Sequence, residues 1–88
     1  MFTRRVVRFS IDNRGIRDLA KARCILCKRR LGVRWFNWTV YTTHEIYCFY
    51  VCGSCDAYLL SLDTSGLAQL LKRLYNDPVN ASDIIHVE

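Results

Sequence analysis

The chain has no apolar run that approaches the ~18 residues of a membrane-spanning helix. Its charged opening, MFTRRVVRFSIDNRG, has no apolar stretch long enough for the core of a secretory leader. These absences argue against a membrane protein and against a secreted one. Because the opening is rich in arginine and poor in acids, an organelle presequence is the alternative interpretation. We therefore expect an intracellular protein of the cytoplasm or nucleus, with an organelle or a virus-infected host cell as the other locations.

The chain has five cysteines, an odd number. It shows no internal repeat beyond its two CxxC motifs, no low-complexity run and no linker. An odd cysteine count fits a secreted disulfide framework poorly, since one thiol would be left over. In a reducing compartment, paired cysteines usually bind metal or do redox chemistry. A chain of 88 residues buries only a modest core, and domains of this size are often stabilised by disulfides or by a structural metal. We predict one zinc-binding domain over residues 1–88, with a metal module at 22–62 and a helix and terminal strand at 63–88.

Acidic residues are scarce in the first third of the chain. Residues 1–34 hold eleven of the thirteen lysines and arginines against Asp12 and Asp18, a formal charge of +11 − 2 = +9. Residues 35–88 hold two cations against six acids, or +2 − 6 = −4. A strongly basic N-terminal third followed by an acidic remainder indicates a polyanionic partner.

Periodicity and turn residues predict a small α+β fold. Residues 4–11 alternate in polarity and are expected to form a strand. Residues 33–41 and 45–51 are aromatic and β-branched, which predicts the two strands of a hairpin. The main helix is expected near 65–75, where leucines recur at helical spacing between capping residues and an Asn-Asp-Pro stop. Two short elements complete the prediction, a helix-permissive stretch at 16–23 and a terminal strand at 83–87 that can pair with the first strand.

Two CxxC motifs, CILC and CGSC, are separated by 24 residues that contain the predicted hairpin. Two residues between thiols allow a tight turn, called a knuckle, that aims both sulfurs at one point and directs backbone N–H groups toward the thiolates. Two knuckles supply the four sulfurs of a tetrahedral site at roughly 2.3 Å from the metal. Four thiolates favour one structural zinc ion, with iron second. The predicted ligands are Cys24, Cys27, Cys52 and Cys55.

The sequence also allows other uses of its cysteines and histidines. A redox CxxC opens a helix beside a βαβ core, and this chain lacks an alternating β and α pattern. A catalytic zinc keeps an open coordination position that four thiolates close, so we do not expect an enzyme. Cys48 shares a strand face with Cys52 and is interpreted as a buried core cysteine, with a place near the metal as the alternative. His44, in the predicted turn, and His86, at the end of the chain, are interpreted as surface histidines rather than as ligands.

The cysteine pattern, CILC followed by CGSCDAYLLSL, is similar to the four-cysteine zinc fingers of the treble-clef type, such as the nuclear-receptor first finger and the GATA-type finger. The resemblance covers residues 24–62 at most and implies that residues 52–55 open a helix, with Asp56 near its N-terminus. In those DNA readers the helix is basic, whereas DAYLLSL is apolar and acidic, so we expect it to pack rather than to read DNA. The competing resemblance is to the zinc ribbon of transcription and ribosomal proteins, in which DAYLLSL would be a third strand.

The segment KARCILCKRRLGVRW surrounds the first knuckle with six cations and no acid. A bound metal would fix this loop, so its side chains would meet phosphate at little further ordering cost. We therefore predict a zinc-stabilised nucleic-acid-binding accessory protein in transcription or RNA metabolism, with no membrane and no small-molecule substrate. The aromatic faces of the hairpin are interpreted as covered by the helix at 65–75 and the terminal strands, with base stacking on Trp35 or Trp38 as an alternative. The predicted nucleic-acid contacts are Arg23, Lys28, Arg29, Arg30, Arg34 and Trp35.

The alternative function is a protein-interaction module. A small subunit or inhibitor would dock its aromatic hairpin and basic face on an acidic or apolar surface of a larger machine such as a polymerase. An acidic partner surface attracts the same basic loop as nucleic acid does, so the sequence leaves both functions open.

Overall fold

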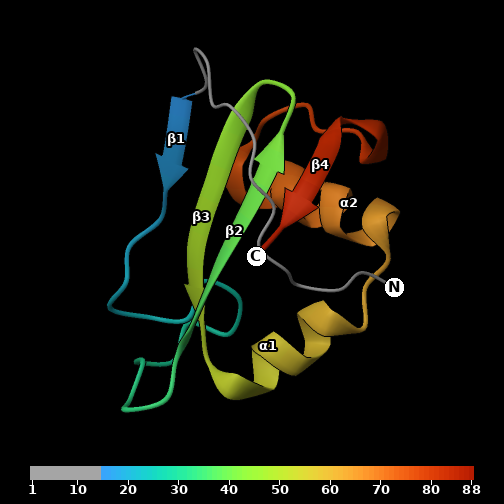
Figure 1. Ribbon diagram of the computed structural model, residues 1–88. Helices are drawn as coiled ribbons and strands as arrows, with labels where there is room; N and C mark the ends of the chain where they lie inside the picture. Colours follow the sequence, from blue (N-terminus) through green and yellow to red (C-terminus); the bar gives the residue numbers. More distant parts are fainter. Residues whose placement is uncertain (1–14) are drawn as a thin grey trace.

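The computed structural model describes residues 15–88 (Figure 1), so the strand predicted at 4–11 lies outside the described residues. The small α+β class is confirmed. Among the described residues, no helix has the length and apolar character that crossing a membrane requires. The elements are β1 (Gly15–Asp18), β2 (Phe36–Thr42), β3 (Glu45–Val51), α1 (Gly53–Leu60), α2 (Thr64–Tyr75), a 3-10 helix (Ala81–Asp83) and β4 (Ile84–Val87).

The strands of the described part form one mixed sheet in the order β1-β3-β2-β4. The predicted hairpin is confirmed: β2 and β3 pair antiparallel, with Phe36 opposite Val51, and the turn Thr43-His44 joins them. The predicted terminal strand is confirmed as β4, which pairs antiparallel with β2. Its pairing with the first predicted strand concerns residues outside the described part and stays a prediction.

The helix-permissive interpretation of residues 16–23 is wrong, because the segment begins as strand β1. It runs parallel to β3, with Gly15 opposite Glu45 and Asp18 opposite Cys48. An isolated helix needs about 12–15 residues to be stable in water, so ladder hydrogen bonds to β3 decide the conformation of this shorter stretch. Because β1 and β3 run in the same direction, both deliver the chain to the same end of the sheet.

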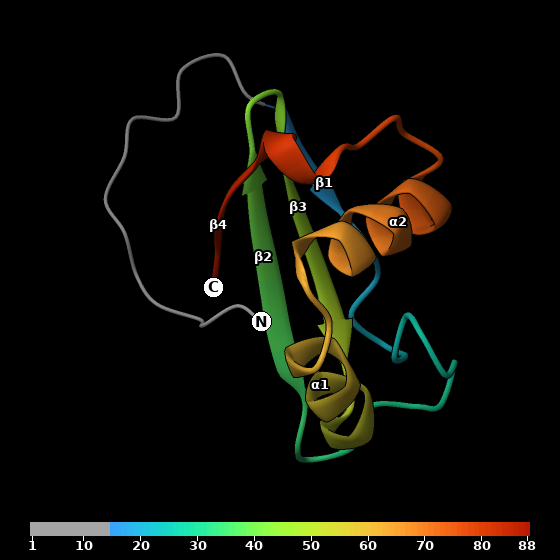
Figure 2. The same ribbon diagram turned by 90° about the vertical axis from the view of Figure 1, so that its right-hand side faces the viewer.

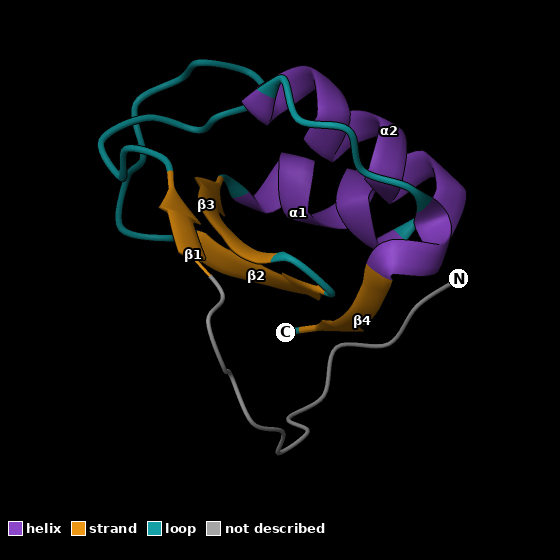
Figure 3. Cartoon of the chain, turned by 90° about the horizontal axis from the view of Figure 1, so that it is seen from above, coloured by secondary structure: helices purple, strands orange, loops and turns teal. Residues whose placement is uncertain are grey.

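Both helices cover one face of the sheet, as the view from above shows (Figure 3). Alternate side chains of the hairpin point toward the helices and form the core, while the residues between them lie on the opposite face, here called the outer face. The helices contribute leucines to the same cluster. The fully buried side chains include Trp38, Val40, Phe49, Val51, Leu59, Leu67 and Leu71.

Helix α2 confirms the main predicted helix and has the expected signals at both ends. The side chain of Asp63 accepts a hydrogen bond from the backbone N–H of Gly66 at 2.7 Å, which satisfies a free donor of the first turn. The helix ends at Asn76, whose φ of 55° lies in the left-handed region, before Pro78. Helix α2 lies beside the sheet, on the same side as α1 (Figure 2), and its residues Leu67, Leu70 and Leu71 are buried.

A buried hydrogen bond joins helix α1 to the hairpin. The indole Nε1–H of Trp38 donates to Asp56 Oδ1 at 2.8 Å, and Asp56 is only 6% exposed. We expect Asp56→Ala to lower the free energy of unfolding by about 1–3 kcal/mol, because the buried indole loses this acceptor. Urea denaturation of the metal-loaded protein measures the change. Asp56→Asn keeps an acceptor oxygen and should recover part of the loss, whereas an unchanged midpoint in Asp56→Ala would contradict the assignment.

Candidate metal centre

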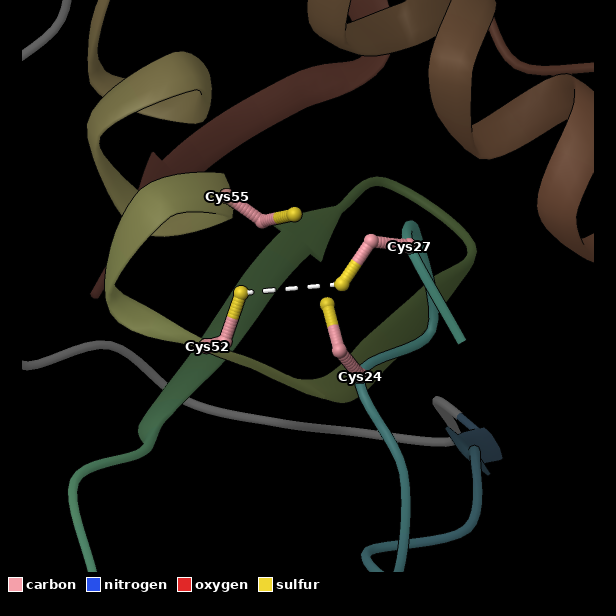
Figure 4. Close-up of side chains that lie close together, drawn as sticks. All are labelled: Cys24, Cys27, Cys52 and Cys55. Atoms are coloured by element: carbon pink, nitrogen blue, oxygen red, sulfur yellow. Dashed lines mark hydrogen bonds between the residues drawn. The ribbon is translucent and has the colours of Figure 1, made fainter. Parts of the chain in front are cut away.

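The first cysteine pair lies in a tight turn between β1 and β2. The backbone N–H of Cys24 donates to the carbonyl of Arg29 at 2.8 Å, and the N–H of Lys28 donates to the carbonyl of Cys24 at 2.9 Å. Lys28 has a φ of 68°, in the left-handed region that glycine adopts most readily. The chain therefore curls back within a few residues, and the thiols of Cys24 and Cys27 approach each other (Figure 4).

Backbone hydrogen bonds hold this turn beside β3. The N–H of Leu19 donates to the carbonyl of Cys48 at 3.0 Å and so continues the pairing of β1 with β3. Inside the first CxxC motif, the N–H of Ile25 donates to the carbonyl of Tyr50 at 3.1 Å. Because Cys52 follows Tyr50 by two residues, the first knuckle is fixed against the strand that leads into the second.

The second cysteine pair opens helix α1. Cys52 is the N-cap residue and Cys55 lies in the first turn, where side chains three residues apart share a face. The N–H of Asp56 donates to the carbonyl of Cys52 at 2.9 Å. Of the two structures expected for DAYLLSL, the helix is confirmed through Leu60, and the third strand of a zinc ribbon is wrong.

The structure brings together the four cysteines predicted as ligands. Their Sγ atoms all lie within 4.8 Å of one another, and those of Cys27 and Cys52 are 3.7 Å apart (Figure 4). Sulfurs about 2.3 Å from one tetrahedral ion lie about 3.8 Å from each other. The cluster is therefore compact enough, and has the right donor atoms, to hold one metal ion. It spans the boundary of the core, since Cys24 is fully buried and Cys27 is exposed.

The thiols of the cluster have unlike electrostatic surroundings. Burial raises the pKa of the Cys24 thiol, but backbone N–H groups, foremost those of Cys27 and Cys52, donate to its sulfur and hold the pKa at about 6. Burial raises the pKa of the Cys55 thiol, and hydrogen bonds with the neighbouring thiols raise it further. One thiolate is thus favoured beside a thiol that resists ionisation. A metal ion would remove this conflict, because its charge stabilises thiolates together.

Cys48 lies outside the cluster. It is half-buried on the outer face of β3, where Asn37 Nδ2 donates to its sulfur at 3.0 Å. The interpretation as a buried core cysteine is wrong, because strand alternation gives the core positions to its neighbours Tyr47 and Phe49. A role beside the metal also finds no support, since the four-sulfur group found among the described residues does not include Cys48.

Neither histidine belongs to the four-sulfur group. His44 is exposed in the turn between β2 and β3, as predicted. His86 is only 7% exposed, and its ring stacks on Tyr41 with the centroids 5.7 Å apart. The prediction of a surface position for His86 is wrong, because β4 pairs along β2 and places His86 opposite Tyr41.

The five cations predicted to contact phosphate surround the first knuckle and are all exposed. The guanidinium of Arg23 donates to the carbonyl of Lys28 at 3.1 Å, and Lys28 Nζ donates to the carbonyl of Ile25 at 3.0 Å. Within residues 15–88, none of the five lies in an ion pair, and the ion pairs that are described join Arg17 to Glu45 and to Asp77. Their charge is therefore uncompensated at close range. The five are Arg23, Lys28, Arg29, Arg30 and Arg34.

The two tryptophans have opposite environments. Trp38 is fully buried, which agrees with the interpretation that the fold covers the hairpin aromatics, and the alternative of base stacking on Trp38 is wrong, whereas Trp35 is 40% exposed. The ring of Trp35 meets that of Tyr50 edge to face, with the centroids 5.8 Å apart, and Lys21 Nζ lies 4.5 Å from the centroid of the Trp35 ring. Sequence reasoning did not assign Lys21 or Tyr50 to a site. Both lay within segments already singled out as basic or aromatic, but only the fold shows that they meet.

The comparisons with protein-family models, curated proteins and solved structures give no match to this chain. Its function has to be inferred from its own residues: a compact four-cysteine cluster within a small α+β fold, surrounded by exposed cations.

Proposed function

We propose that this chain is a zinc-stabilised nucleic-acid-binding protein in which one structural zinc ion holds a basic knuckle in place for contact with phosphate. Four thiolates in a tetrahedron suit zinc, with iron as the second choice. A knuckle, a hairpin and a helix opened by the last ligand pair are the parts of a treble-clef finger, and we assign the site to that type. The proposed ligands are Cys24, Cys27, Cys52 and Cys55.

The observation that carries the proposal is the set of exposed, uncompensated cations on the knuckle. The backbone of the turn that holds Lys28 and Arg29 is fixed by the hydrogen bonds around Cys24 and to β3, so phosphate contact there would require little further ordering of the chain. Such contacts give affinity without reading sequence, and each releases counterions from the nucleic acid. Helix α1 packs against the core through the buried side chains of Asp56 and Leu59, so we assign it no role in the major groove of DNA. An accessory role in transcription or RNA metabolism suits a protein of this kind.

Removal of two knuckle cations is expected to weaken binding. We expect Arg29→Ala/Arg30→Ala to reduce the affinity for labelled oligonucleotides and to lower the slope of log affinity against log salt by about 1–2, because each lost phosphate contact removes about 0.7–0.9 from that slope. Fluorescence anisotropy of the zinc-loaded protein at several salt concentrations measures both quantities. The metal content of the variant should remain one ion per chain.

Lys72→Ala/Arg73→Ala is the matched control. It removes the same charge from the last turn of α2, where both side chains are exposed. If the basic knuckle is the contact surface, this control leaves the salt slope unchanged. Equal losses in the two double variants would instead mean that net charge alone attracts the oligonucleotide, and the absence of binding even at low salt would overturn the proposed function.

A protein-interaction module remains the second candidate. Tyr58 is 52% exposed on α1 beside a surface groove that it shares with Leu62 and Lys72, which favours docking of another protein there. The hairpin aromatics Trp38 and Phe49 are fully buried, however, so fewer apolar side chains are free for a partner than the sequence suggested. If oligonucleotide binding fails, capture of a partner by wild type but not by Tyr58→Ala would support this function. Neither function involves catalysis.

A further inference from the structure

We infer that the nucleic acid bound by this protein is single-stranded, and that an unpaired base stacks on Trp35. The inference rests on the proposed function and names its ligand class. The site consists of Trp35, Tyr50 and Lys21 and is here called the aromatic platform. It lies on the outer face, at the end of the sheet where the first knuckle is fixed to β3.

The aromatic platform is supported by a contact between rings and is open to solvent. Trp35 immediately precedes β2, and Tyr50 belongs to β3, so the edge-to-face contact joins two paired strands at their ends. Tryptophan is usually well buried in a folded chain. Here a large ring packs edge to face against Tyr50 and keeps 40% of its surface exposed. A base can therefore stack on it with little loss of side-chain conformational entropy.

Lys21 completes the platform with a positive charge. Its Nζ lies 4.5 Å from the centroid of Trp35 and 5.9 Å from that of Tyr50. At an exposed site, such a cation–π contact is weaker than the stacking of a base on an aromatic ring. An incoming base can thus displace the flexible Lys21 side chain from the ring. The ammonium group then pairs with the phosphate next to that base, so the charge of Lys21 still contributes to binding.

The surroundings of the platform favour a single strand over a duplex. In a duplex the faces of each base are covered by its neighbours, so only an unpaired base can offer a face to Trp35. Arg34 is adjacent to Trp35 in the chain and is exposed, and Lys21 leads directly into the knuckle cations. An aromatic ring for stacking next to basic side chains, here Lys21 and Arg34, is the arrangement found where proteins bind single strands. A duplex reader would need a free helix or ribbon for the major groove, and α1 is packed against the core.

The fluorescence of Trp35 provides the test. Zinc-loaded protein is titrated with single-stranded oligo-dT and oligo-rU and with a duplex of equal length, while tryptophan emission and anisotropy are both recorded. We expect the single strands to bind more tightly and to quench emission, since a base stacks on Trp35 while Trp38 stays buried. Trp35→Leu should abolish the quenching and weaken single-strand binding by about tenfold. Trp35→Phe should restore part of that affinity, because it keeps an aromatic face.

Tyr58→Leu is the control, because it removes a similarly exposed aromatic ring from helix α1 and should change neither affinity nor quenching. The inference is overturned if Trp35→Leu binds single strands as wild type does, or if the duplex binds equally well. If that happens while Arg29→Ala/Arg30→Ala still weakens salt-dependent binding, the phosphate contacts stand and only the platform is wrong. If no oligonucleotide binds at low salt, the proposed function fails and the inference fails with it.

Discussion

Chelation of the metal is expected to unfold this protein. Zinc binding in small four-ligand domains contributes on the order of 10 kcal/mol or more to folding, whereas a whole domain is stable by only about 5–15 kcal/mol. The cluster joins three parts of the chain, namely the first knuckle, the end of β3 and the start of α1. Without the ion, backbone hydrogen bonds hold the pKa of the Cys24 thiol at about 6, whereas burial and the neighbouring cysteines raise the pKa of Cys55, so the cluster does not readily supply several thiolates together. Far-UV circular dichroism before and after chelation measures the loss of structure.

Two cysteine variants separate the metal site from cysteine chemistry in general. Cys52→Ser removes a proposed ligand and should lose the bound ion and the fold together. Cys48→Ser changes the remaining thiol, which lies on the outer face away from the cluster, and should retain one ion per chain. An unchanged spectrum after complete metal removal would contradict the structural role, and loss of the ion from Cys48→Ser would show that the ligand set is wrong.

The parts of the structure that the sequence predicted are those encoded by local patterns. The hairpin follows from two runs of aromatic and β-branched residues, and α2 follows from leucine spacing between a capping aspartate and a proline stop. The cysteine cluster follows from spacing as well, because two CxxC turns on either side of a hairpin can converge. The helical state of residues 53–60 was left open, since eight residues with a weak pattern fit either a helix or a strand.

The parts that the sequence could not predict depend on contacts between distant residues. Residues 15–18 form a strand because they pair with the edge of β3. The residues of the segment itself do not indicate this pairing. His86 is buried because β4 pairs along β2, and Cys48 is only half-buried because its neighbours on β3 take the core positions. The meeting of Lys21, Trp35 and Tyr50 requires the same topology. Local propensity gives no information on any of these contacts, so the sequence points to Trp35 as a stacking residue, but only the fold shows that Lys21 and Tyr50 lie beside it.

Leu71→Ala is expected to cause the second-largest loss of stability. Leu71 is fully buried in the face of α2 that packs on the sheet. Its truncation should lower the free energy of unfolding by about 2–5 kcal/mol, because the cavity adds to the lost transfer energy of the removed atoms. For a domain with so small a core this is a large fraction of the total. Leu74→Ala, three residues later and half-buried, removes the same atoms and should cost clearly less. Urea denaturation of both metal-loaded variants measures the difference.

The metal content of Leu71→Ala tests whether the metal site depends on the packing of α2 against the sheet. The cluster is built by the first knuckle, β3 and α1, and within residues 15–88 none of its ligands, and none of the backbone hydrogen bonds around them, comes from α2. In the absence of denaturant we therefore expect Leu71→Ala to retain one ion per chain, and excess zinc to raise its urea midpoint, since a ligand that binds only the folded state stabilises it by mass action. Loss of the ion from this variant would show that α2 supports the knuckle as well as the sheet. Equal urea midpoints for Leu71→Ala and Leu74→Ala would mean that α2 does not pack on the sheet through Leu71.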